Sequence, residues 1–275
     1  MADVAELDAP ATADALTPPQ GWRRLRQVLG WMIGVAALLL IWRSALAVFQ
    51  VPAFVMPTPE AVFGALIANA QAIGLAALFT TRNALLGLAV AFALAISLAA
   101  LFVSSRRLTS AILPVVIALR TAPVLAIAPI LIMIFGRGLG AAIAVVVIVS
   151  FFPIMVNAMK GFSSTPTHAL ELMHVLGAGW LKTFARVRAP FALPHIFAGS
   201  RSAATSALLA AMLAEWLSGA PGLGSMILQA SSFRRSALMW AVVVVSMCAA
   251  FAAFSMTSWL ERRLTTWRPQ PGERQ

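Results

Sequence analysis

Long apolar blocks alternate with short charged stretches along most of this chain. Residues 83–105 contain no charged side chain, and about 20 apolar residues in a helix are enough to cross a bilayer. Such blocks predict six membrane-spanning helices, at residues 28–49, 79–103, 109–135, 139–159, 191–217 and 236–260. Prolines interrupt the third block, which is tolerated where neighbouring helices or a water-lined cavity satisfy the backbone. We therefore expect an all-α integral membrane protein.

The stretch between the first two blocks is the most ambiguous part of the pattern. Thr58-Pro59-Glu60 has the form of a helix start. Residues 61–81 lack charge and could span by length alone, but Asn69, Gln71 and Gly74 dilute them. A span there would also invert every later loop. We therefore expect a helix lying at the outer surface over residues 59–79.

Charges recur among apolar positions at residues 165–194, between the fourth and fifth blocks. Thr165 is the expected N-cap of a short amphipathic helix, with Pro166 at its first helical position. The apolar stripe of that helix is Ala169, Leu172, Met173 and Leu176. Gly177 and Gly179 supply its stop, because glycine tolerates the left-handed conformation that closes a helix.

A second short amphipathic helix follows directly. Its apolar positions are Trp180, Leu181, Phe184 and Val187, and Lys182, Thr183, Arg186 and Arg188 lie away from them. Pro190 and Pro194 are expected to end this helix and to lead into the fifth apolar block.

The composition supports a membrane protein and excludes a nucleic-acid-binding one. Hydrophobic residues make up 61% of the chain and charged residues 11%, against about 25% charged in soluble domains. The net charge is +11, but the basic residues lie between apolar blocks instead of forming one patch. Cys248 is the only cysteine, so no intramolecular disulfide can form.

The basic residues also set the orientation. With six spans, the N-terminus, the loop after residue 103, the 160–190 loop and the C-terminal tail share one side, which carries most of the Lys and Arg. The other side keeps Arg82, Arg137, Arg234 and Arg235. Positive-inside asymmetry then places both termini in the cytoplasm of a cell whose inner (plasma) membrane holds the protein.

These boundaries predict three parts: a disordered cytoplasmic N-terminus (1–26), a transmembrane domain (27–263) and a cytoplasmic tail (264–275). The first 20 residues are rich in Ala, Pro and Asp and contain four acids and no base, as is typical of disorder. A signal peptide cleaved near Ala45-Leu46-Ala47 is the alternative. The acidic leader and Arg43 favour a retained first span.

The 165–194 segment resembles the EAA loop of binding-protein-dependent ABC importer permeases, written EAA-x3-G-x9-I-x-LP. Glu171, Gly177, Val187 and Pro190 match its acid, glycine, aliphatic residue and proline at the same spacing. Leu172, Met173 and Ala189 replace the two alanines and the leucine. In that family the loop forms a coupling helix that docks into a groove on the ATPase subunit. The alternative is an ordinary interfacial amphipathic hairpin.

The wider chain is similar to the nitrate, sulfonate and taurine permeases, a type that includes uptake of thiamine-precursor pyrimidines. The matching pieces are residues 120–123, 135–138, 152–153, 214–216 and 222–224, with Pro129, Asn157, Gly161, Pro190, Pro194 and Gly199. The resemblance implies a MetI-like permease fold, a homodimer, two ATPase subunits and an extracytoplasmic solute-binding protein. It implies a sulfonate- or nitrate-like anion as solute, with a thiamine-precursor pyrimidine as the alternative.

The candidate site residues fall into two sets. The ATPase-coupling loop is assigned to Thr167, Glu171, His174, Gly177, Ala178, Val187 and Pro190, and the translocation pathway to Arg120, Asn157 and Glu215. An isolated guanidinium in a bilayer is costly, so Arg120 is expected to face the dimer or a wet pathway and to bind an anion there. The alternative is a structural ion pair with Glu215. Glu215, at the end of an apolar block, marks a functional site or is simply hydrated at the interface.

Metal and nucleotide sites are not expected in this chain. His168 and His174 point about 120° apart around a helix, and no further acid or cysteine beyond Glu171 lies nearby. A phosphate-binding GxxxxGK[ST] loop is absent from the sequence, so ATP and Mg²⁺ are expected on the ATPase partner. Glycines 87, 140 and 199 are expected to allow close helix packing.

Two other classes of protein are weaker interpretations. A membrane-embedded enzyme needs paired acids, a His/Asp set or a nucleophile–base pair within its spans, and the predicted spans hold one borderline acid and no histidine apart from His195 near a span end. A stand-alone secondary transporter would be favoured by internal repeats of spans, which the sequence does not show.

Overall fold

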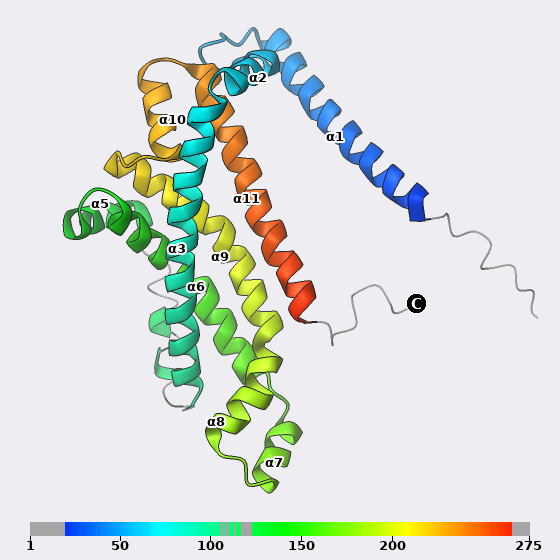
Figure 1. Cartoon of the computed structure of the whole chain (residues 1–275), viewed down its shortest axis with the longest axis vertical. Coiled ribbons are helices and arrows are strands. Elements are labelled where there is room, and N and C mark those ends of the chain that lie inside the picture. Colours follow the sequence, from blue (N-terminus) through cyan, green and yellow to red (C-terminus); the bar gives the residue numbers. More distant parts are fainter. Residues whose placement is uncertain (1–19, 105–106, 108–109, 113, 117–122, 266–275) are drawn as a thin grey trace, which may run out of the picture. The chain divides into compact units, whose positions relative to one another are not determined.

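The computed structural model describes residues 20–104, 107, 110–112, 114–116 and 123–265. Every regular element in those ranges is a helix, which confirms the all-α prediction. The chain divides into two compact units, Met1–Pro59 and Glu60–Gln275. Figure 1 colours the helices along the sequence.

The first unit contains one long helix, α1 (Gln20–Phe49). Its segment Met32–Phe49 is apolar and long enough to cross a membrane, which confirms a helix at the first predicted span. The helix begins earlier than predicted: residues 20–26, expected to belong to the disordered N-terminus, are its first turns. Extending an existing helix adds one hydrogen bond for each residue fixed, so the helix of the apolar block continues into the polar residues that precede it.

The second unit holds the other helices whose bounds the structure describes. In chain order they are α2 (Pro59–Ala68), α3 (Ala70–Val103), α5 (Val124–Phe135), α6 (Leu139–Ser163), α7 (Thr167–Val175), α8 (Trp180–Thr183), the π-helix η2 (Phe184–Arg188), α9 (Ala189–Ser218), α10 (Leu223–Ser232) and α11 (Ser236–Leu264). Helix α6 lies between α3 and α9 and packs extensively on both, and α11 packs on α9. These helices form the bundle.

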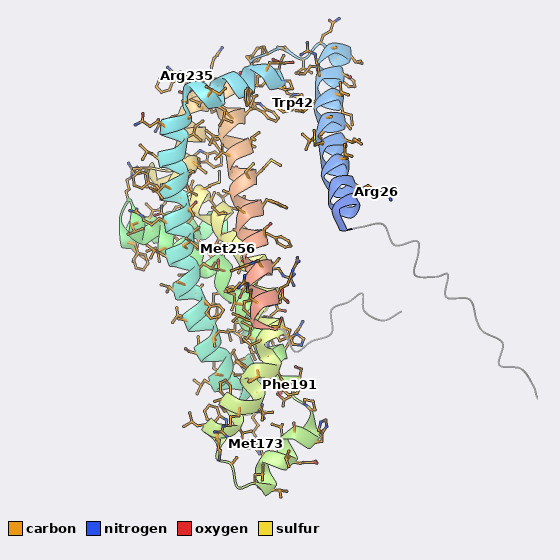
Figure 2. The ribbon with its side chains drawn as sticks, turned by 45° about the vertical axis from the view of Figure 1, so that its right-hand side comes forward. Arg26, Trp42, Met173, Phe191, Arg235 and Met256 are labelled. Carbon is orange, nitrogen blue, oxygen red and sulfur yellow. The ribbon has the colours of Figure 1, made fainter. Side chains whose placement is uncertain are left out.

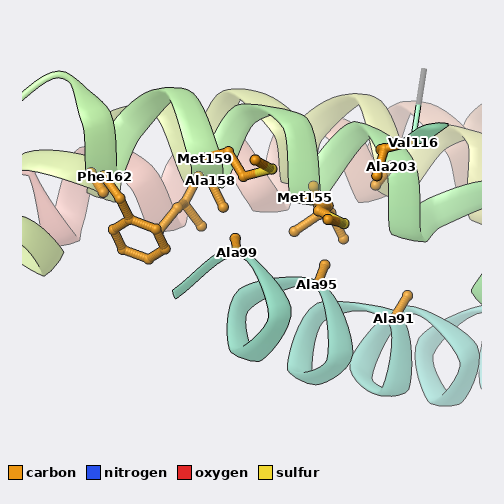
Figure 3. Close-up of a cluster of buried hydrophobic side chains, with 12 residues drawn as sticks. Ala91, Ala95, Ala99, Val116, Met155, Ala158, Met159, Phe162 and Ala203 are labelled. Atoms are coloured by element: carbon orange, nitrogen blue, oxygen red, sulfur yellow. The ribbon is translucent and has the colours of Figure 1, made fainter. Parts of the chain in front are cut away.

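Small side chains line the face of α3 that packs on the bundle. Ala91, Ala95 and Ala99 recur every four residues and are fully buried. They face Met155 and other large side chains of α6, as Figure 3 shows. Small residues on one helix opposite large ones on the next let the two backbones approach closely, which is how helices associate in lipid without a hydrophobic driving force.

Glycines mark the closest helix crossings. A Cβ atom on Gly87 of α3 would lie 2.5 Å from Cβ of Val146 in α6. One on Gly199 of α9 would lie 2.8 Å from both the Asn157 Cβ and the Pro153 carbonyl oxygen of α6. The predicted packing role of Gly87 and Gly199 is therefore confirmed. Gly140 differs. A Cβ atom added to it would meet only Phe135 at the end of α5, with the carbonyl oxygen at 3.3 Å.

Five helical segments are long and apolar enough to cross a membrane: Met32–Phe49, Ala70–Val103, Leu139–Ser163, Trp180–Ser218 and Ser236–Leu264. They correspond to five of the six predicted spans. In the third predicted span, 109–135, the structure describes α5, whose 12 residues extend about 18 Å, less than a hydrocarbon core of about 30 Å. Residues 117–122 lie outside the described part of the chain, so the six-span count stays a prediction.

The predicted surface helix over residues 59–79 is wrong in its second half. Asn69 separates the short helix α2 from α3, and α3 then runs without a break from Ala70 to Val103. The backbone leaves helical geometry at Asn69, with φ −117° and ψ 19°, and the Asn69 side-chain amide donates to the carbonyl oxygen of Ala65 at the end of α2, at 2.8 Å. The few polar residues after it do not interrupt a helix that packs along its whole length.

The predicted helix end at Pro190 is also wrong. The chain is helical from Trp180 to Ser218, and both Pro190 and Pro194 lie within that stretch. Proline has no N–H group and its ring clashes with the carbonyl group four residues earlier. Here the π-helical turn Phe184–Arg188 precedes Pro190, and its wider hydrogen-bond spacing lets the helix continue past the proline.

Candidate functional site: an exposed hairpin and a buried carboxylate

The α7–α8 hairpin (residues 165–188) extends from the end of the bundle where α6 stops and α9 begins, as Figure 1 shows. Thr165 does not cap α7 as predicted. It is buried, and its hydroxyl donates to the carbonyl oxygen of Phe162 at 3.3 Å, so it closes α6 instead. Pro166 stands at the N-cap position, and its carbonyl oxygen accepts the N–H groups of Ala169 and Leu170.

Gly177 ends α7 as predicted. Its φ angle is 66°, a left-handed conformation that glycine adopts at little cost. The N–H groups of Gly177 and Ala178 donate to the carbonyl oxygens of His174 and Met173, both at 2.9 Å. This pair of bonds closes the helix and directs the chain back toward the bundle.

Aromatic rings fix the base of the hairpin. Trp180 stacks on Phe184 with ring centroids 5.2 Å apart, and Phe184 packs on Phe162 of α6 at 4.9 Å. The guanidinium of Arg188 donates to the carbonyl oxygen of Phe162 at 3.4 Å. The hairpin is therefore held against α6 at the point where the chain enters α9.

The tip of the hairpin exposes aliphatic side chains. The exposed fractions are 59% for Leu172, 82% for Val175, 66% for Leu176 and 77% for Leu181, and we call these four residues the aliphatic tip. The predicted stripe thus forms a helix, but two of its members, Leu172 and Leu176, are mostly exposed in the part of the chain that the structure describes. Exposed aliphatic side chains in a charged segment are typical of a surface that binds another protein.

The predicted coupling residues differ in their exposure. Thr167, Glu171, His174 and Gly177 are exposed, and Ala178, Val187 and Pro190 are half-buried toward the bundle. Figure 2 shows Met173, in the middle of α7, at the end of the second unit opposite Arg235. The hairpin therefore exposes aliphatic and polar side chains together, a composition found in protein–protein contacts.

A second arrangement lies in the bundle, around the fully buried Glu215 of α9. Its Oε2 accepts hydrogen bonds from the Thr80 hydroxyl at 2.8 Å and the Gly224 N–H at 3.1 Å, and its Oε1 accepts from the Asn83 side-chain amide at 3.0 Å. The Thr80 hydroxyl in turn accepts the Leu223 N–H at 2.8 Å. We call these five residues the Glu215 cluster.

The Glu215 cluster caps α10 from outside that helix. Leu223 and Gly224 are its first two residues, whose N–H groups have no partner within a helix. The N-cap residue Gly222 has no side chain to accept them. Thr80 of α3 and Glu215 of α9 take that place, and a carboxylate is favourable there because the N-terminal end of a helix carries partial positive charge.

Two glycines make room for the carboxyl group. A Cβ atom on Gly222 would overlap the Glu215 carboxyl group, and one on Gly224 would overlap the backbone carbonyl of Met212. The close approach of this turn to α9 therefore depends on both glycines. The same residues, Gly222-Leu223-Gly224, carry part of the predicted family resemblance.

A family model described as "Binding-protein-dependent transport system inner membrane component" matches residues 91–266 of this chain. The match runs from within α3 through the hairpin to the end of α11, and it includes Glu215, Leu223 and Gly224 of the Glu215 cluster. The chain belongs to this family. It is the permease component of an ABC importer, as the EAA-like spacing and the apolar blocks predict.

Curated relatives agree with this assignment. The riboflavin transport permease RibX of Chloroflexus aurantiacus is 33% identical over 87% of this permease and 90% of its own length. The aliphatic sulfonates transport permease SsuC of Bacillus subtilis is 29% identical over 88% and 90%. The formylaminopyrimidine transport permease ThiX of Halalkalibacterium halodurans is 32% identical over 59% and 65%. The predicted likeness to sulfonate and thiamine-precursor permeases is confirmed.

Solved structures confirm the fold. The methionine ABC transporter MetNI, in an inward-facing conformation, matches with a TM-score of 0.64 over 70% of this permease and 96% of the solved chain. The sequence identity is 18%, so this likeness concerns the fold alone.

The structure describes two of the three predicted pathway residues, Asn157 and Glu215. Arg120 lies outside the described residues. Asn157 lies where α6 crosses α9, half-buried, and its amide donates to the carbonyl oxygen of Pro153 in its own helix at 2.8 Å. Glu215 lies in its own cluster near the α10 end of the permease.

Sequence reasoning missed the partners of Glu215. Thr80 and Asn83 are three residues apart on α3 and precede Ala84, Gly87 and Ala91 on its buried face. The sequence did contain a signal for this contact: Thr80 and Asn83 continue the stripe of small residues on an apolar helix. Polar side chains at such positions face a partner helix instead of lipid.

A second missed contact joins α9 to α11. The Arg201 guanidinium and the Glu261 carboxylate form an ion pair at 3.2 Å, with 33% and 19% of their side chains exposed. Arg201 lies within a predicted span, where a charged residue signals a partner on a neighbouring helix.

Proposed function

We propose that the aliphatic tip of the α7–α8 hairpin is the surface on which an ABC ATPase subunit docks. The observation that carries this proposal is the exposure of four aliphatic side chains on a segment whose base is fastened to α6 and α9. A docked subunit would cover the tip. Its movement on binding and hydrolysing ATP would pull on both helices and shift the permease between inward- and outward-facing states.

The proposed orientation follows the basic residues. The hairpin and the end of α11 carry Lys182, Arg186, Arg188, Arg262 and Arg263. By positive-inside asymmetry these residues support an orientation in which the hairpin and both termini face the cytoplasm. The opposite end of the second unit, with α10 and Arg235, then faces the outside. An ATPase subunit can reach the hairpin only in this orientation.

The complete importer contains other chains. ATP and Mg²⁺ are bound by the ATPase subunits, because the permease sequence has no phosphate-binding loop of the GxxxxGK[ST] kind. A second copy of the permease completes a homodimer, and an extracytoplasmic solute-binding protein delivers the solute. Membership of the binding-protein-dependent family supports this composition.

The proposed solute is a small anion of the sulfonate or nitrate type. The sulfonate permease SsuC supports it, since it aligns with most of this chain. Arg120 is the residue we assign to the anion, because a guanidinium amid apolar residues needs an anionic partner. A thiamine-precursor pyrimidine is the second candidate, and the permease ThiX supports it over a shorter match.

Co-purification tests the docking surface. Val175→Asp places a charge on the most exposed residue of the aliphatic tip, and loss of a buried contact of this kind weakens binding about 30-fold or more. We expect an affinity-tagged permease to lose the ATPase subunit with this substitution. Ser163→Asp is the matched control: it adds the same charge at an exposed position near the hairpin but off the tip. Equal recovery of the ATPase subunit with both variants would contradict the proposal.

A further inference from the structure

Helix α10 is a separate short element at the end of the bundle opposite the hairpin (Figure 1). Its 10 residues extend about 15 Å, too short to cross a bilayer. It packs on α9, α11 and α3 through buried side chains that include Leu223 and Ala230. A helix this short is marginal on its own and depends on the contacts that hold it.

We propose that Glu215 is the positioning residue of α10, holding the helix on α3 and α9 at the outer end of the permease. The outer location rests on the orientation proposed above, whereas the anchoring itself does not. Through Oε2 the carboxylate contacts both the first turn of α10 and Thr80, and through Oε1 it contacts Asn83. One side chain therefore connects three helices.

The direction of each hydrogen bond explains why an acceptor is needed at this position. The Thr80 hydroxyl has one proton, which it gives to Glu215, so that its oxygen is free to accept the Leu223 N–H. The Asn83 amide and the Gly224 N–H also donate. Removing the carboxyl group leaves three buried donors without an acceptor, and each such loss weakens the attachment of α10.

The glycines point independently to the same role. Gly222 and Gly224 both lie where a side chain would collide, one with the Glu215 carboxyl group and the other with the α9 backbone. A turn that only connected two helices would not need to approach α9 so closely. The turn is shaped to bring the first N–H groups of α10 onto the carboxylate.

Amide hydrogen exchange of α10 tests the proposal without knowledge of the solute. The measurement uses the purified full-length permease and compares amides 226–232 of α10 with amides of α6, since local detachment raises exchange only in the element that opens. For Glu215→Ala we expect the α10 amides to exchange about tenfold to a hundredfold faster, as for lost hydrogen bonds to a charged group. The α6 amides should be unchanged. Glu215→Gln keeps one acceptor oxygen and should change α10 exchange less than about tenfold.

A covalent link in place of the carboxylate provides the rescue. A Cβ atom on Gly222 would reach the Glu215 carboxyl group, so Glu215→Cys with Gly222→Cys brings two Cβ atoms near the disulfide separation of about 3.5–4.5 Å. Cys248→Ser removes the only other thiol. Oxidation should return α10 exchange to within about twofold of wild type, and reduction should raise it about tenfold or more.

Three results would overturn the proposal: unchanged α10 exchange in Glu215→Ala, an equal rise in α6, or no protection by the disulfide. If Glu215→Ala does not accumulate in membranes, Thr80→Val carries the same test, because it removes one donor to Glu215 and the acceptor for Leu223. Recovery of the ATPase subunit, measured on the same samples, should be unchanged. Conversely, Val175→Asp should lose the ATPase subunit and leave α10 exchange unchanged, so the two proposals can fail separately.

Discussion

The two ends of the second unit reverse the usual relation between a side chain and its surroundings. At the hairpin, four aliphatic side chains are exposed in a charged segment. At the Glu215 cluster, a carboxyl group is buried among apolar helices. In the Glu215 cluster, the Thr80 hydroxyl, the Asn83 amide and the Gly224 N–H each donate to the Glu215 carboxyl group, so these buried donors find their acceptor within the chain. The hairpin differs, because its aliphatic tip is exposed among the described residues. The Glu215 cluster holds helices of the same chain together, whereas the hairpin exposes the surface that we propose for the ATPase subunit.

The largest stability effect that separates the two ends should come from paired glycine substitutions. Gly222→Ala places a Cβ atom on the Glu215 carboxyl group and displaces it from its donors, which should cost about 3 kcal/mol or more. Gly177→Ala meets no atom within 4 Å, so only its φ angle of 66° opposes it, at about 1 kcal/mol. Thermal unfolding of the purified variants in one detergent compares them. A larger loss for Gly177→Ala would remove the contrast.

A smaller effect should come from removing one hydroxyl group. Thr80→Val keeps the shape but removes a donor to Glu215 and an acceptor for the Leu223 N–H, for about 1–3 kcal/mol. Thr257→Val is the matched control, because that hydroxyl donates only to the carbonyl oxygen of Ala253 in its own helix, at 2.8 Å. We expect unfolding temperatures to drop clearly for the first and little for the second. Similar drops would mean that the cluster does not stabilise the fold.

The smallest effect should come from the ion pair between α9 and α11. Both side chains are partly exposed, so the interaction of Arg201 with Glu261 should contribute about 1 kcal/mol or less. A double-mutant cycle with Arg201→Gln and Glu261→Gln measures it. A coupling energy as large as the effect of Thr80→Val would show that buried hydrogen bonds are not what distinguishes the Glu215 cluster.

Local rules predicted much of the hairpin and little of the cluster. The 3.6-residue period, Pro166 and Gly177 act within one or two turns of helix, and α7 starts and stops within one residue of its predicted bounds. The contacts of Glu215 with Thr80 and Asn83 join residues 135 and 132 positions apart. No local pattern selects such a pair, because it depends on how α3 packs beside α9.

The wrong helix boundaries have a similar origin. At Pro190 a proline that stops an isolated helix is accommodated by a π-helical turn within a packed one. After Asn69 the polar residues expected to keep the chain at the surface are carried into α3 by continuous packing. In both places tertiary contacts outweigh a local preference of a few kcal/mol or less.

The most direct test of the account is which side of the membrane exposes the hairpin tip. Leu181→Cys in a Cys248→Ser permease places a single thiol at a position that is 77% exposed. We expect a membrane-impermeant maleimide to label it in inside-out vesicles and not in intact cells, and a bound ATPase subunit to block the labelling. Labelling from outside intact cells would place the hairpin beyond the reach of any cytoplasmic ATPase and would contradict the account.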